Sequence, residues 1–310
     1  MKIGVVDLDT SHPQNWIPIE RELGHEVSGL WDGGAVHPAE YVAKFAAEKE
    51  VPRIYASLEE MARDVDIAII HGCNWDTHIS KARPFVEAGK AVLLDKPLAG
   101  NLRDLRQIVR WENEGARITG GSSLRYCEEV RDWLARPLAE PGTPRVLPHT
   151  AICGCGTDEF NYGIHAYSLL SAVMGPGIRS VRHLRSGPQR RIQVNWHDAR
   201  MGLLIVGEAS YIPFHATVVS LKEVTHLVPQ AGKLYRALLE ATLPYLAGES
   251  AEPPMRAAAL IEPELCALAA RKSWLSDDRE VLLSELSEAD SGYDGAIFAA
   301  GYRRMRYPQQ

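Results

Sequence analysis

The sequence predicts an α/β protein with an N-terminal doubly wound parallel sheet and a C-terminal α+β domain whose sheet is mainly antiparallel and open on one face. Two observations predict this class. Over the first 120 residues, β-like runs alternate with helical patterns, which is typical of right-handed βαβ units. After residue 126, β-rich runs follow one another without helices between them, which favours antiparallel pairing. We therefore expect two domains, residues 1–125 and 126–310.

The expected elements follow from hydrophobic periodicity and from turn residues. In the first domain we expect strands at 2–9, 26–32, 66–71, 91–95 and 117–121. Between them we expect helices at 14–23, 38–49, 58–63, 78–88 and 102–114, the last capped by Asn101. In the second domain we expect a helix at 162–174, β-rich runs at 178–186, 190–209 and 211–227, helices at 229–246 and 256–271, and a less regular tail from 284.

Composition excludes several classes of partner. The formal net charge of -6 disfavours general nucleic-acid binding, because phosphate binding needs a concentrated basic face. Five cysteines are too few and too oddly spaced for a disulfide framework, which favours a reducing cytoplasm. The chain enters a β-like run at Lys2 without a basic or apolar leader, and no apolar run approaches the length of a membrane span. We expect a cytoplasmic protein with a small-molecule substrate and without nucleic-acid or membrane partners.

Lys96 stands at the most informative position of the sequence. The apolar run 91–94 predicts a buried strand, and Pro97 prevents its ladder of hydrogen bonds from continuing. Ligands of open α/β sheets bind outside the carboxyl ends of the strands, so an ammonium at this point is well placed to contact a substrate. The alternative is a solvated lysine at the end of a strand.

Residues 87–99 resemble the helix, strand and "EKP" signature of the Gfo/Idh/MocA family of sugar and cyclitol dehydrogenases. Three other segments are similar to this family: 74–78 to its "TPNxxH" segment, 120–126 to its "GxNxRx" link, and 256–262 to its late helix. The similarity spans residues 1–285 in order and spacing. It implies a Rossmann-like N-terminal domain in which Lys96 lies beside nicotinamide and substrate.

A glycine-rich approach and a helix at 154–170 resemble the family's "GGGxxxDxGxH" element. The match puts His165 on the family's histidine and Asn161 on its aspartate. The two residues are four apart, so we expect them on one helical face. Asparagine can hold a hydroxyl group but cannot accept its proton, so the resemblance implies that His165 is the general base and that Lys96 polarises the reacting oxygen. Arg125 and Tyr162 are candidate substrate contacts.

The cofactor end departs from the family pattern. Aligned on Gly4, the three positions of the G-x-G-x-x-G fingerprint fall on Asp7, Asp9 and His12. Carboxylates would repel a pyrophosphate at a few ångströms, which indicates a displaced cofactor or none. Asp32, at the end of the second expected strand, either binds the ribose hydroxyls of NAD or belongs to an ordinary Asp-Gly-Gly turn.

Several potential ligands gather at the expected strand ends. We expect the cofactor end of the crevice to hold Asp7, Asp9, His12, Asp32 and His71. A divalent metal is a second possibility, held by the set Asp7, Asp9 and His12 or by the set His71, Cys73, Asp76 and His78. Helix capping by residues 9–11 and a helix start at His78 explain both sets without a metal, so we assign no metal ligand.

Two enzyme functions remain open. The first is an oxidoreductase that acts on a sugar, cyclitol or similar polyhydroxylated molecule by hydride transfer, with NAD(P) as the cofactor. The alternative is a non-redox lyase, isomerase or hydrolase on the same scaffold, cofactor-free or metal-assisted, which the altered first turn and Asn161 favour. A non-catalytic binding protein ranks last, because it gives no reason for Lys96 and His165 to occur together. We also expect a homodimer or higher homo-oligomer built on the open sheet face.

Overall fold

The computed structural model describes residues 1–136, 148–185, 187, 189–207, 211–220 and 223–309. The chain forms two compact units. The first unit comprises Met1–Gly121, Leu239–Leu260 and Asp294–Gln310, and the second comprises Ser122–Leu238 and Ile261–Tyr293. The sequence suggested two continuous segments, whereas the first unit also takes in two segments from the later part of the chain.

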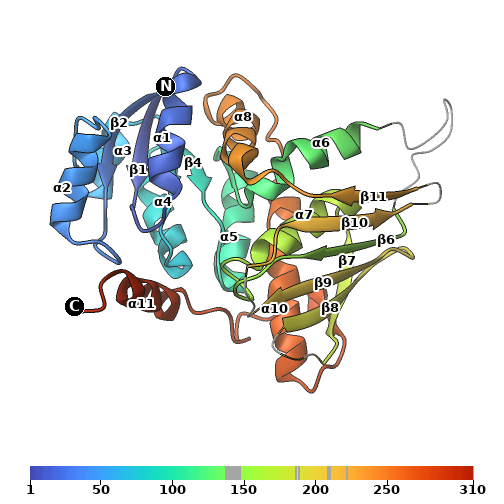
Figure 1. Ribbon diagram of the computed structural model, residues 1–310. Helices are drawn as coiled ribbons and strands as arrows, with labels where there is room; N and C mark the ends of the chain where they lie inside the picture. The colour runs from blue at the N-terminus through green and yellow to red at the C-terminus, as the bar shows by residue number, and fades with distance from the viewer. Residues whose placement is uncertain (137–147, 186, 188, 208–210, 221–222, 310) are drawn as a thin grey trace. The chain divides into compact units, whose positions relative to one another are not determined.

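A five-stranded parallel sheet forms the centre of the first unit (Figure 1). Its strands are β1 (Lys2–Val6), β2 (Glu26–Trp31), β3 (Ile67–Ile70), β4 (Ala91–Leu94) and β5 (Ile118–Gly120). The order is β2-β1-β3-β4-β5, and every pair is parallel. The helices of this unit are α1 (His12–Glu22), α2 (Ala39–Glu48), α3 (Leu58–Asp64), α4 (His78–Glu87), α5 (Leu102–Asn113), α9 (Ala257–Leu260) and α11 (Gly295–Arg306). The predicted fold class is confirmed for this half of the molecule.

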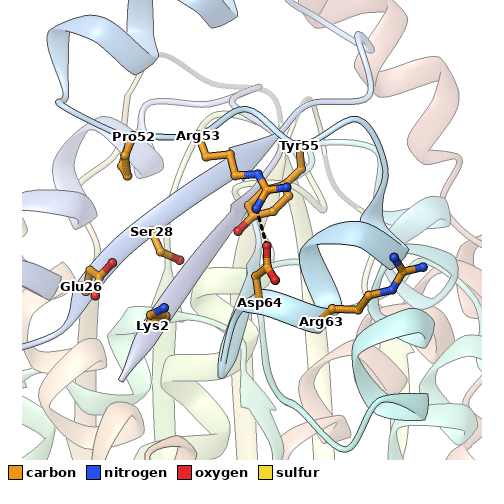
Figure 2. A pocket seen from close by; sticks show the side chains of 8 residues that line it. All are labelled: Lys2, Glu26, Ser28, Pro52, Arg53, Tyr55, Arg63 and Asp64. Carbon is orange, nitrogen blue, oxygen red and sulfur yellow. Dashed lines mark hydrogen bonds and ion pairs between the residues drawn. The ribbon is translucent and has the colours of Figure 1, made fainter.

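The amino ends of β1 and β2 border a surface pocket (Figure 2). Lys2 and Glu26 are the first residues of these two strands, so the pocket lies at the opposite edge of the sheet from the strand carboxyl ends. Arg53 in its lining pairs with Asp64 at 2.5 Å. The pocket is therefore remote from the edge where open α/β sheets bind their ligands.

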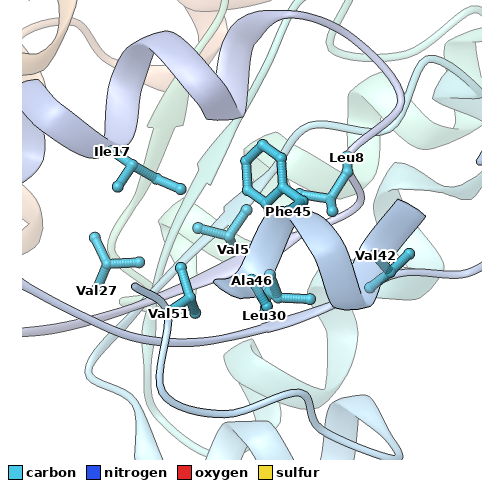
Figure 3. Close-up of a cluster of buried hydrophobic side chains, with 9 residues drawn as sticks. All are labelled: Val5, Leu8, Ile17, Val27, Leu30, Val42, Phe45, Ala46 and Val51. Carbon is cyan, nitrogen blue, oxygen red and sulfur yellow. The ribbon is translucent and has the colours of Figure 1, made fainter. Parts of the chain in front are cut away.

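Apolar side chains of β1 and β2 pack against helices α1 and α2 (Figure 3). The cluster consists of Val5, Leu8, Ile17, Val27, Leu30, Val42, Phe45, Ala46 and Val51, all of them buried. Val42, Phe45 and Ala46 recur at helical spacing, so they form one face of α2. This packing holds the β1–α1 connection, which carries the altered fingerprint, against a rigid core.

Helices α1 to α5 begin and end within two residues of the expected bounds, whereas the C-terminal tail differs from expectation. Asn101 caps α5 as predicted, and its side-chain oxygen accepts a hydrogen bond from the backbone N–H of Asp104 at 3.0 Å. The prediction of an irregular tail was wrong, because α11 occupies Gly295–Arg306. Its apolar pattern is weak, since Ile297 and Met305 are exposed and only Gly295 and Ala299 are buried.

A seven-stranded sheet forms the second unit. Its strands are β6 (Thr150–Gly154), β7 (Ile178–His183), β8 (Gln189–Trp196), β9 (Met201–Gly207), β10 (His215–Val219), β11 (Val224–Leu227) and β12 (Val281–Leu282). The order is β11-β10-β6-β9-β8-β7-β12. Neighbouring strands are antiparallel except for the parallel pair β6 and β9, which confirms the mainly antiparallel sheet.

Helices cover one face of this second sheet. They are α7 (Ile164–Met174) and α10 (Glu262–Leu275), whereas α6 (Glu128–Ala135) packs on α7 and α8 (Leu234–Leu246) crosses the boundary between the units. α7 packs on β6 and β9, and α10 packs on β7. α6 was not among the elements expected from the sequence. On the uncovered face, Ile152 and Met201 are each 38% exposed.

The part of the chain that the structure describes also contains the short 3-10 helices η1 (Trp75–Thr77), η2 (Ser123–Tyr126), η3 (Ala231–Lys233) and η4 (Leu283–Glu285). Within the described ranges, no helix combines the length and the apolar character that a membrane crossing requires. All five cysteines are buried and free, as their spacing predicted.

Candidate active site

Three neighbouring strands of the first unit deliver polar residues to one edge of the sheet. β1 leads into the turn before His12, and β3 and β4 are followed directly by His71 and Asp95. Asp95 Oδ2 lies 2.5 Å from His12 Nδ1 and 3.2 Å from His71 Nδ1. Asp95 Oδ1 accepts a hydrogen bond from the backbone N–H of Lys96 at 2.7 Å. One carboxylate therefore holds two imidazoles and the backbone of the motif lysine.

The charge of Asp95 follows from these contacts. Its side chain is buried, which by itself would raise the pKa of the carboxyl group. The interactions with His12 and His71 outweigh burial and hold the pKa of Asp95 well below its ordinary value. Burial lowers the pKa of His71, so this ring is neutral near pH 7. Asp95 was not among the site residues expected from the sequence, although its place beside Lys96 in the motif was a usable signal.

Asp7 keeps the turn that the first fingerprint glycine normally makes. Its φ of 66° lies in the left-handed region, which is uncommon for residues other than glycine. Its carboxylate is buried, pairs with Lys81 Nζ at 2.5 Å and accepts a hydrogen bond from the backbone N–H of Gly33 at 3.1 Å. A Cβ atom on Gly72 would lie 2.6 Å from Asp7 Oδ2, so glycine at position 72 leaves room for this side chain.

The carboxylates of Asp9 and Asp32 also accept hydrogen bonds from backbone N–H groups of the surrounding loops. Asp9 Oδ2 accepts a hydrogen bond from Cys73 N–H at 2.9 Å, and burial with the nearby Asp7 charge raises the pKa of Asp9 to about 6. Asp32 accepts from the backbone N–H groups of Leu8 and Gly34 at 2.8 and 2.7 Å. We expected Asp7 and Asp9 to face the crevice and repel a pyrophosphate. In the structure both side chains are buried and Lys81 pairs with Asp7, while the repulsion itself stays a prediction.

Residues of the two metal-ligand sets considered from the sequence make hydrogen bonds within the protein. The nitrogens of His78 lie 3.1 and 2.6 Å from the carbonyl oxygens of Leu98 and Gly72, and Asp76 accepts from the backbone N–H of Gly295. Among the described residues, His12, His71 and Asp95 bring donor atoms within 4.8 Å of one another. We interpret this set as hydrogen-bonded, because a single carboxylate oxygen meets both imidazoles at hydrogen-bonding distance.

His165 occupies the first turn of α7 in the second unit. It is 6% exposed, and its Nδ1 lies 2.7 Å from the hydroxyl oxygen of Ser122. The ring centroids of Phe214 and Tyr162 lie 5.0 and 5.6 Å from that of His165. Burial raises the pKa of the Tyr162 hydroxyl. His165 is thus held in a fixed orientation by one hydroxyl group and two aromatic rings.

Asn161 lies outside the helix that carries His165. α7 begins at Ile164, so the expectation that both residues share one helical face was wrong. The chain before α7 is held in a turn, because Asp158 Oδ1 accepts from the backbone N–H groups of Phe160 and Tyr162, both at 2.9 Å.

Arg125 is an interior cation of the second unit. It belongs to η2 and is 6% exposed, and this burial lowers its pKa while the charges of Glu262 and Glu264 oppose the shift. Glu262 in turn accepts from the backbone N–H groups of Gly177 and Ile178. Lys96 belongs to the first unit and His165 and Arg125 to the second. Their use in one site therefore remains a prediction.

The parallel sheet, the strand-end lysine and the retained first turn define the class of the first unit as a dinucleotide-binding domain of the Rossmann type. Residues 3–120 match the family model GFO_IDH_MocA, an oxidoreductase family with an NAD-binding Rossmann fold. The matched range includes Lys96 and the "EKP"-like motif around it.

Relatives and solved structures extend the comparison. Trans-1,2-dihydrobenzene-1,2-diol dehydrogenase of Danio rerio is 36% identical over 70 residues, which are 22% of this chain and 21% of that protein. The match thus spans about a fifth of the length of this curated relative. A probable dehydrogenase from Thermotoga maritima has a TM-score of 0.76 at 16% identity and covers 93% of this chain and 100% of its own. Myo-inositol dehydrogenase from Lactobacillus casei, solved with NAD(H) and myo-inositol, has a TM-score of 0.75 at 15% identity over 91% of this chain and 96% of its own. At these identities the structures show the fold of both units.

Proposed function

We propose that this protein is an NAD(P)-dependent oxidoreductase that transfers a hydride at a carbinol or carbonyl carbon of a polyhydroxylated small molecule. Lys96 carries the proposal. It follows β4 at the carboxyl edge of the parallel sheet and lies within the matched range 3–120. The names of the similar proteins include a diol dehydrogenase and an inositol dehydrogenase, whose substrates both carry adjacent hydroxyl groups.

The residues of the first unit fit a dinucleotide. Asp7 keeps the left-handed turn after β1, and α1 begins at His12, as a fingerprint turn requires. Lys81 pairs with the Asp7 carboxylate, which offsets one of the two charges expected to repel a pyrophosphate. The Asp32 carboxylate at the end of β2 is only partly buried, which supports a contact with ribose hydroxyls and a preference for NAD. The cofactor, when bound, supplies the hydride acceptor or donor.

We assign roles by the family resemblance and by position. Lys96 polarises the reacting oxygen, His165 transfers the proton, and Asn161 holds a substrate hydroxyl. Arg125 and Tyr162 contribute to substrate binding. We assign the cofactor end to Asp7, Asp9, His12, Asp32 and His71. Asp7, Asp9 and His71 are at most 1% exposed, so their proposed role is indirect: they hold the surrounding loops in place.

A non-redox reaction on the same scaffold is the second candidate. One observation favours it: the Asp7 side chain fills space at the fingerprint turn and ties the β1 loop to Gly33 and Lys81. A turn that the protein's own side chains fill does not depend on a bound pyrophosphate for its conformation. In this case Lys96 would polarise a carbonyl or hydroxyl group without hydride transfer.

Titration of the purified protein with NAD(H) and NADP(H), followed by calorimetry and fluorescence, separates the two candidates. Turnover is then measured with myo-inositol, scyllo-inositol and trans-1,2-dihydrobenzene-1,2-diol. Micromolar binding of NAD(H) with substrate-dependent NADH formation supports the oxidoreductase. Failure of both nucleotides to bind at millimolar concentration rejects it in favour of the non-redox candidate.

We further propose a cytoplasmic homodimer or higher homo-oligomer that uses the uncovered face of the second sheet. Helices α7 and α10 cover the opposite face, whereas apolar side chains such as Ile152 and Met201 remain accessible on the uncovered one. Burying such a face against a second copy removes apolar surface from water.

A further inference from the structure

Helix α11 contacts the loops that follow two strands of the parallel sheet. We call them the β2 loop, residues 32–38, and the β3 loop, residues 71–77. At the start of α11, the backbone N–H of Gly295 donates to Asp76 Oδ2 in the β3 loop at 2.8 Å. Near its end, Arg303 Nη1 donates to the carbonyl oxygen of Gly34 in the β2 loop at 3.1 Å. The helix and both loops belong to the same compact unit.

Between these two contacts, α11 spans the carboxyl end of β1. The strand order is β2-β1-β3, so a helix that contacts the β2 loop and the β3 loop bridges the end of the strand between them. The order also reverses here, because the chain runs from β1 to β2 on one side and continues with β3 on the other side of β1. Open α/β sheets bind their ligands at such a switch point. α11 therefore lies at the place where this fold binds a dinucleotide.

The contact with the β2 loop marks the adenosine side of that place. In dinucleotide-binding folds, the acidic residue at the end of the second strand binds the ribose hydroxyls. Asp32 holds this position, directly after β2. Its carboxylate accepts from the backbone N–H of Gly34 at 2.7 Å, and the carbonyl oxygen of Gly34 accepts from Arg303. The residue expected to bind ribose and the contact with α11 thus belong to one turn.

Apolar side chains hold the middle of α11 against both loops. Ala299 is 4% exposed and belongs to a buried cluster with Val36 of the β2 loop and Cys73 of the β3 loop. Phe298 and Tyr302, from the same face of the helix, pack against this cluster. A ligand that enters between the two loops must therefore separate α11 from the cluster.

His37 connects the end of the C-terminal segment to the β1–α1 connection. Its Nδ1 lies 2.7 Å from the hydroxyl oxygen of Tyr307, the residue that follows α11. The backbone of Leu8 and Asp9 also interacts with the His37 side chain. The C-terminal segment is thus tied to the turn that carries the altered fingerprint as well as to the β2 and β3 loops.

Few buried residues hold α11 in this position. Gly295 and Ala299 are its buried residues, whereas Ile297 and Met305 are 69% and 72% exposed. A helix of this length is marginally stable in water without tertiary contacts. Elements with few buried apolar contacts open at a low free-energy cost, so α11 can leave the loops while the sheet and its core stay folded.

We propose that α11 is a lid on the adenosine side of the dinucleotide site, and that NAD(H) binds after this helix has separated from the β2 and β3 loops. The inference rests on the proposed function, because it concerns how the dinucleotide of that function enters its site. In the closed state, the side chains of Phe298, Ala299 and Tyr302 pack where the two loops must part. The apparent affinity for the cofactor is then reduced by the fraction of molecules whose lid is open.

Gly295→Ala tests the lid at its contact with the β3 loop. A Cβ atom on Gly295 would lie 2.7 Å from Asn74 Oδ1 and 2.8 Å from the backbone nitrogen of Trp75, so alanine displaces the start of α11. Gly301→Ala is the matched control in the same helix, because a Cβ atom there would lie 3.9 Å from Arg304 Nη2, an ordinary contact. Calorimetric titration with NAD(H) should show a Kd about tenfold or more lower in Gly295→Ala and nearly unchanged in Gly301→Ala.

An unchanged or higher Kd in Gly295→Ala overturns the proposal, since a helix that forms a fixed wall of the site would lose cofactor contacts when displaced. Tyr307→Phe is a second variant at the other end of the segment. It removes the hydroxyl group that meets His37 and keeps the ring, so the Kd should again fall. If the melting curve shows that Gly295→Ala does not fold, Tyr307→Phe decides by the same criterion.

Hydrogen exchange of the unmodified protein follows the opening itself. With saturating NAD(H), the amides of α11 should exchange faster than in the free protein, because the bound dinucleotide keeps the lid open. The amides of α3 should not change, since Arg63 and Asp64 of this helix line the pocket at the opposite edge of the sheet. Equal or slower exchange of α11 in the complex overturns the proposal.

Failure of the lid and failure of the proposed function give different results. If NAD(H) binds but the exchange of α11 does not rise, the lid is wrong and the oxidoreductase stands. If neither NAD(H) nor NADP(H) binds the unmodified protein or Gly295→Ala, and α11 exchanges rapidly in that variant, the proposed function fails and the lid fails with it.

Discussion

His12 and Asp95 are 83 residues apart in the sequence, and their side chains meet at 2.5 Å between Nδ1 and Oδ2. The strand order explains this contact. β1, β3 and β4 are consecutive in the sheet, so residues that follow their carboxyl ends gather along one edge. The histidine that replaces the third fingerprint glycine thereby contacts the carboxylate that precedes the motif lysine. His12, which departs from the family pattern, thus has its partner Asp95 on the same edge of the sheet.

Asp7→Asn should destabilise the protein strongly. The substitution leaves Lys81 as a buried ammonium without its carboxylate, and breaking a buried pair by removing one partner costs about 3–5 kcal/mol. Asparagine tolerates a left-handed backbone, so the φ of 66° does not confound the result. Urea denaturation measures the free energy of unfolding.

Glu48→Gln is the matched control for Asp7→Asn. Glu48 pairs with Lys44 at 3.6 Å on the surface, with both side chains more than half exposed, and such pairs contribute at most about 0.5 kcal/mol. Lys81→Met combined with Asp7→Asn should recover part of the loss, because neither charge is then left buried alone. Equal effects of Asp7→Asn and Glu48→Gln on the free energy of unfolding would show that the buried pair contributes no more to stability than the surface pair.

Glu20 should make stability depend on pH. It is fully buried in α1, both carboxylate oxygens lack a hydrogen-bond partner among the described residues, and burial raises its pKa from 4.5 to about 8. Below the unfolded pKa both states are protonated, and this contribution is fully present. As the pH rises from 4.5 to 8, unfolding releases the proton, so stability falls by up to about 5 kcal/mol and then levels off.

Glu20→Gln should remove this dependence. Thermal denaturation at pH 5, 7 and 9 should show a difference between the variant and the unmodified protein that grows with pH. Glu22→Gln, an exposed residue of the same helix, should not change the profile. Parallel profiles for Glu20→Gln and the unmodified protein would mean that Glu20 does not stay protonated in the folded state.

Lys96→Met should leave folding nearly intact and lower turnover about a hundredfold or more, because the lysine stabilises charge at the reacting oxygen. Lys90→Met is the control, since Lys90 precedes β4 and Lys96 follows it, and both are partly buried. The measurement is kcat/KM on a confirmed polyol substrate, with the melting temperature as a check on folding. Similar activity in the two variants would identify Lys96 as a solvated residue.

Ile152→Glu should dissociate the proposed oligomer. Ile152 lies on β6 in the interior of the second sheet and is 38% exposed on the uncovered face. Light scattering should give a multiple of 34.3 kDa for the unmodified protein and 34.3 kDa for the variant. Ile54→Glu, at a 48% exposed position of the first unit, should leave the mass unchanged. A mass of 34.3 kDa for the unmodified protein at micromolar concentration would contradict the proposal.

The sequence by itself determined the alternation of strands and helices in the first unit and the place of Lys96. These features are local, because hydrophobic periodicity and capping residues act within a few turns of the chain. It also indicated the family, through the motif around Lys96. It failed where local spacing was extended across a turn, as for Asn161, or where a helix buries few residues, as for α11.

Only the tertiary structure decided the direction of the charged side chains. Asp7 meets Lys81 across 74 residues, and Asp95 meets His12 across 83, so neither partner can be identified from neighbouring residues. The strand order β1-β3-β4 brings these positions together, and burial then requires each carboxylate to find a cation or a hydrogen-bond donor. An acidic residue that the sequence predicts will repel a ligand can thus be satisfied inside the fold by a cation or a hydrogen-bond donor.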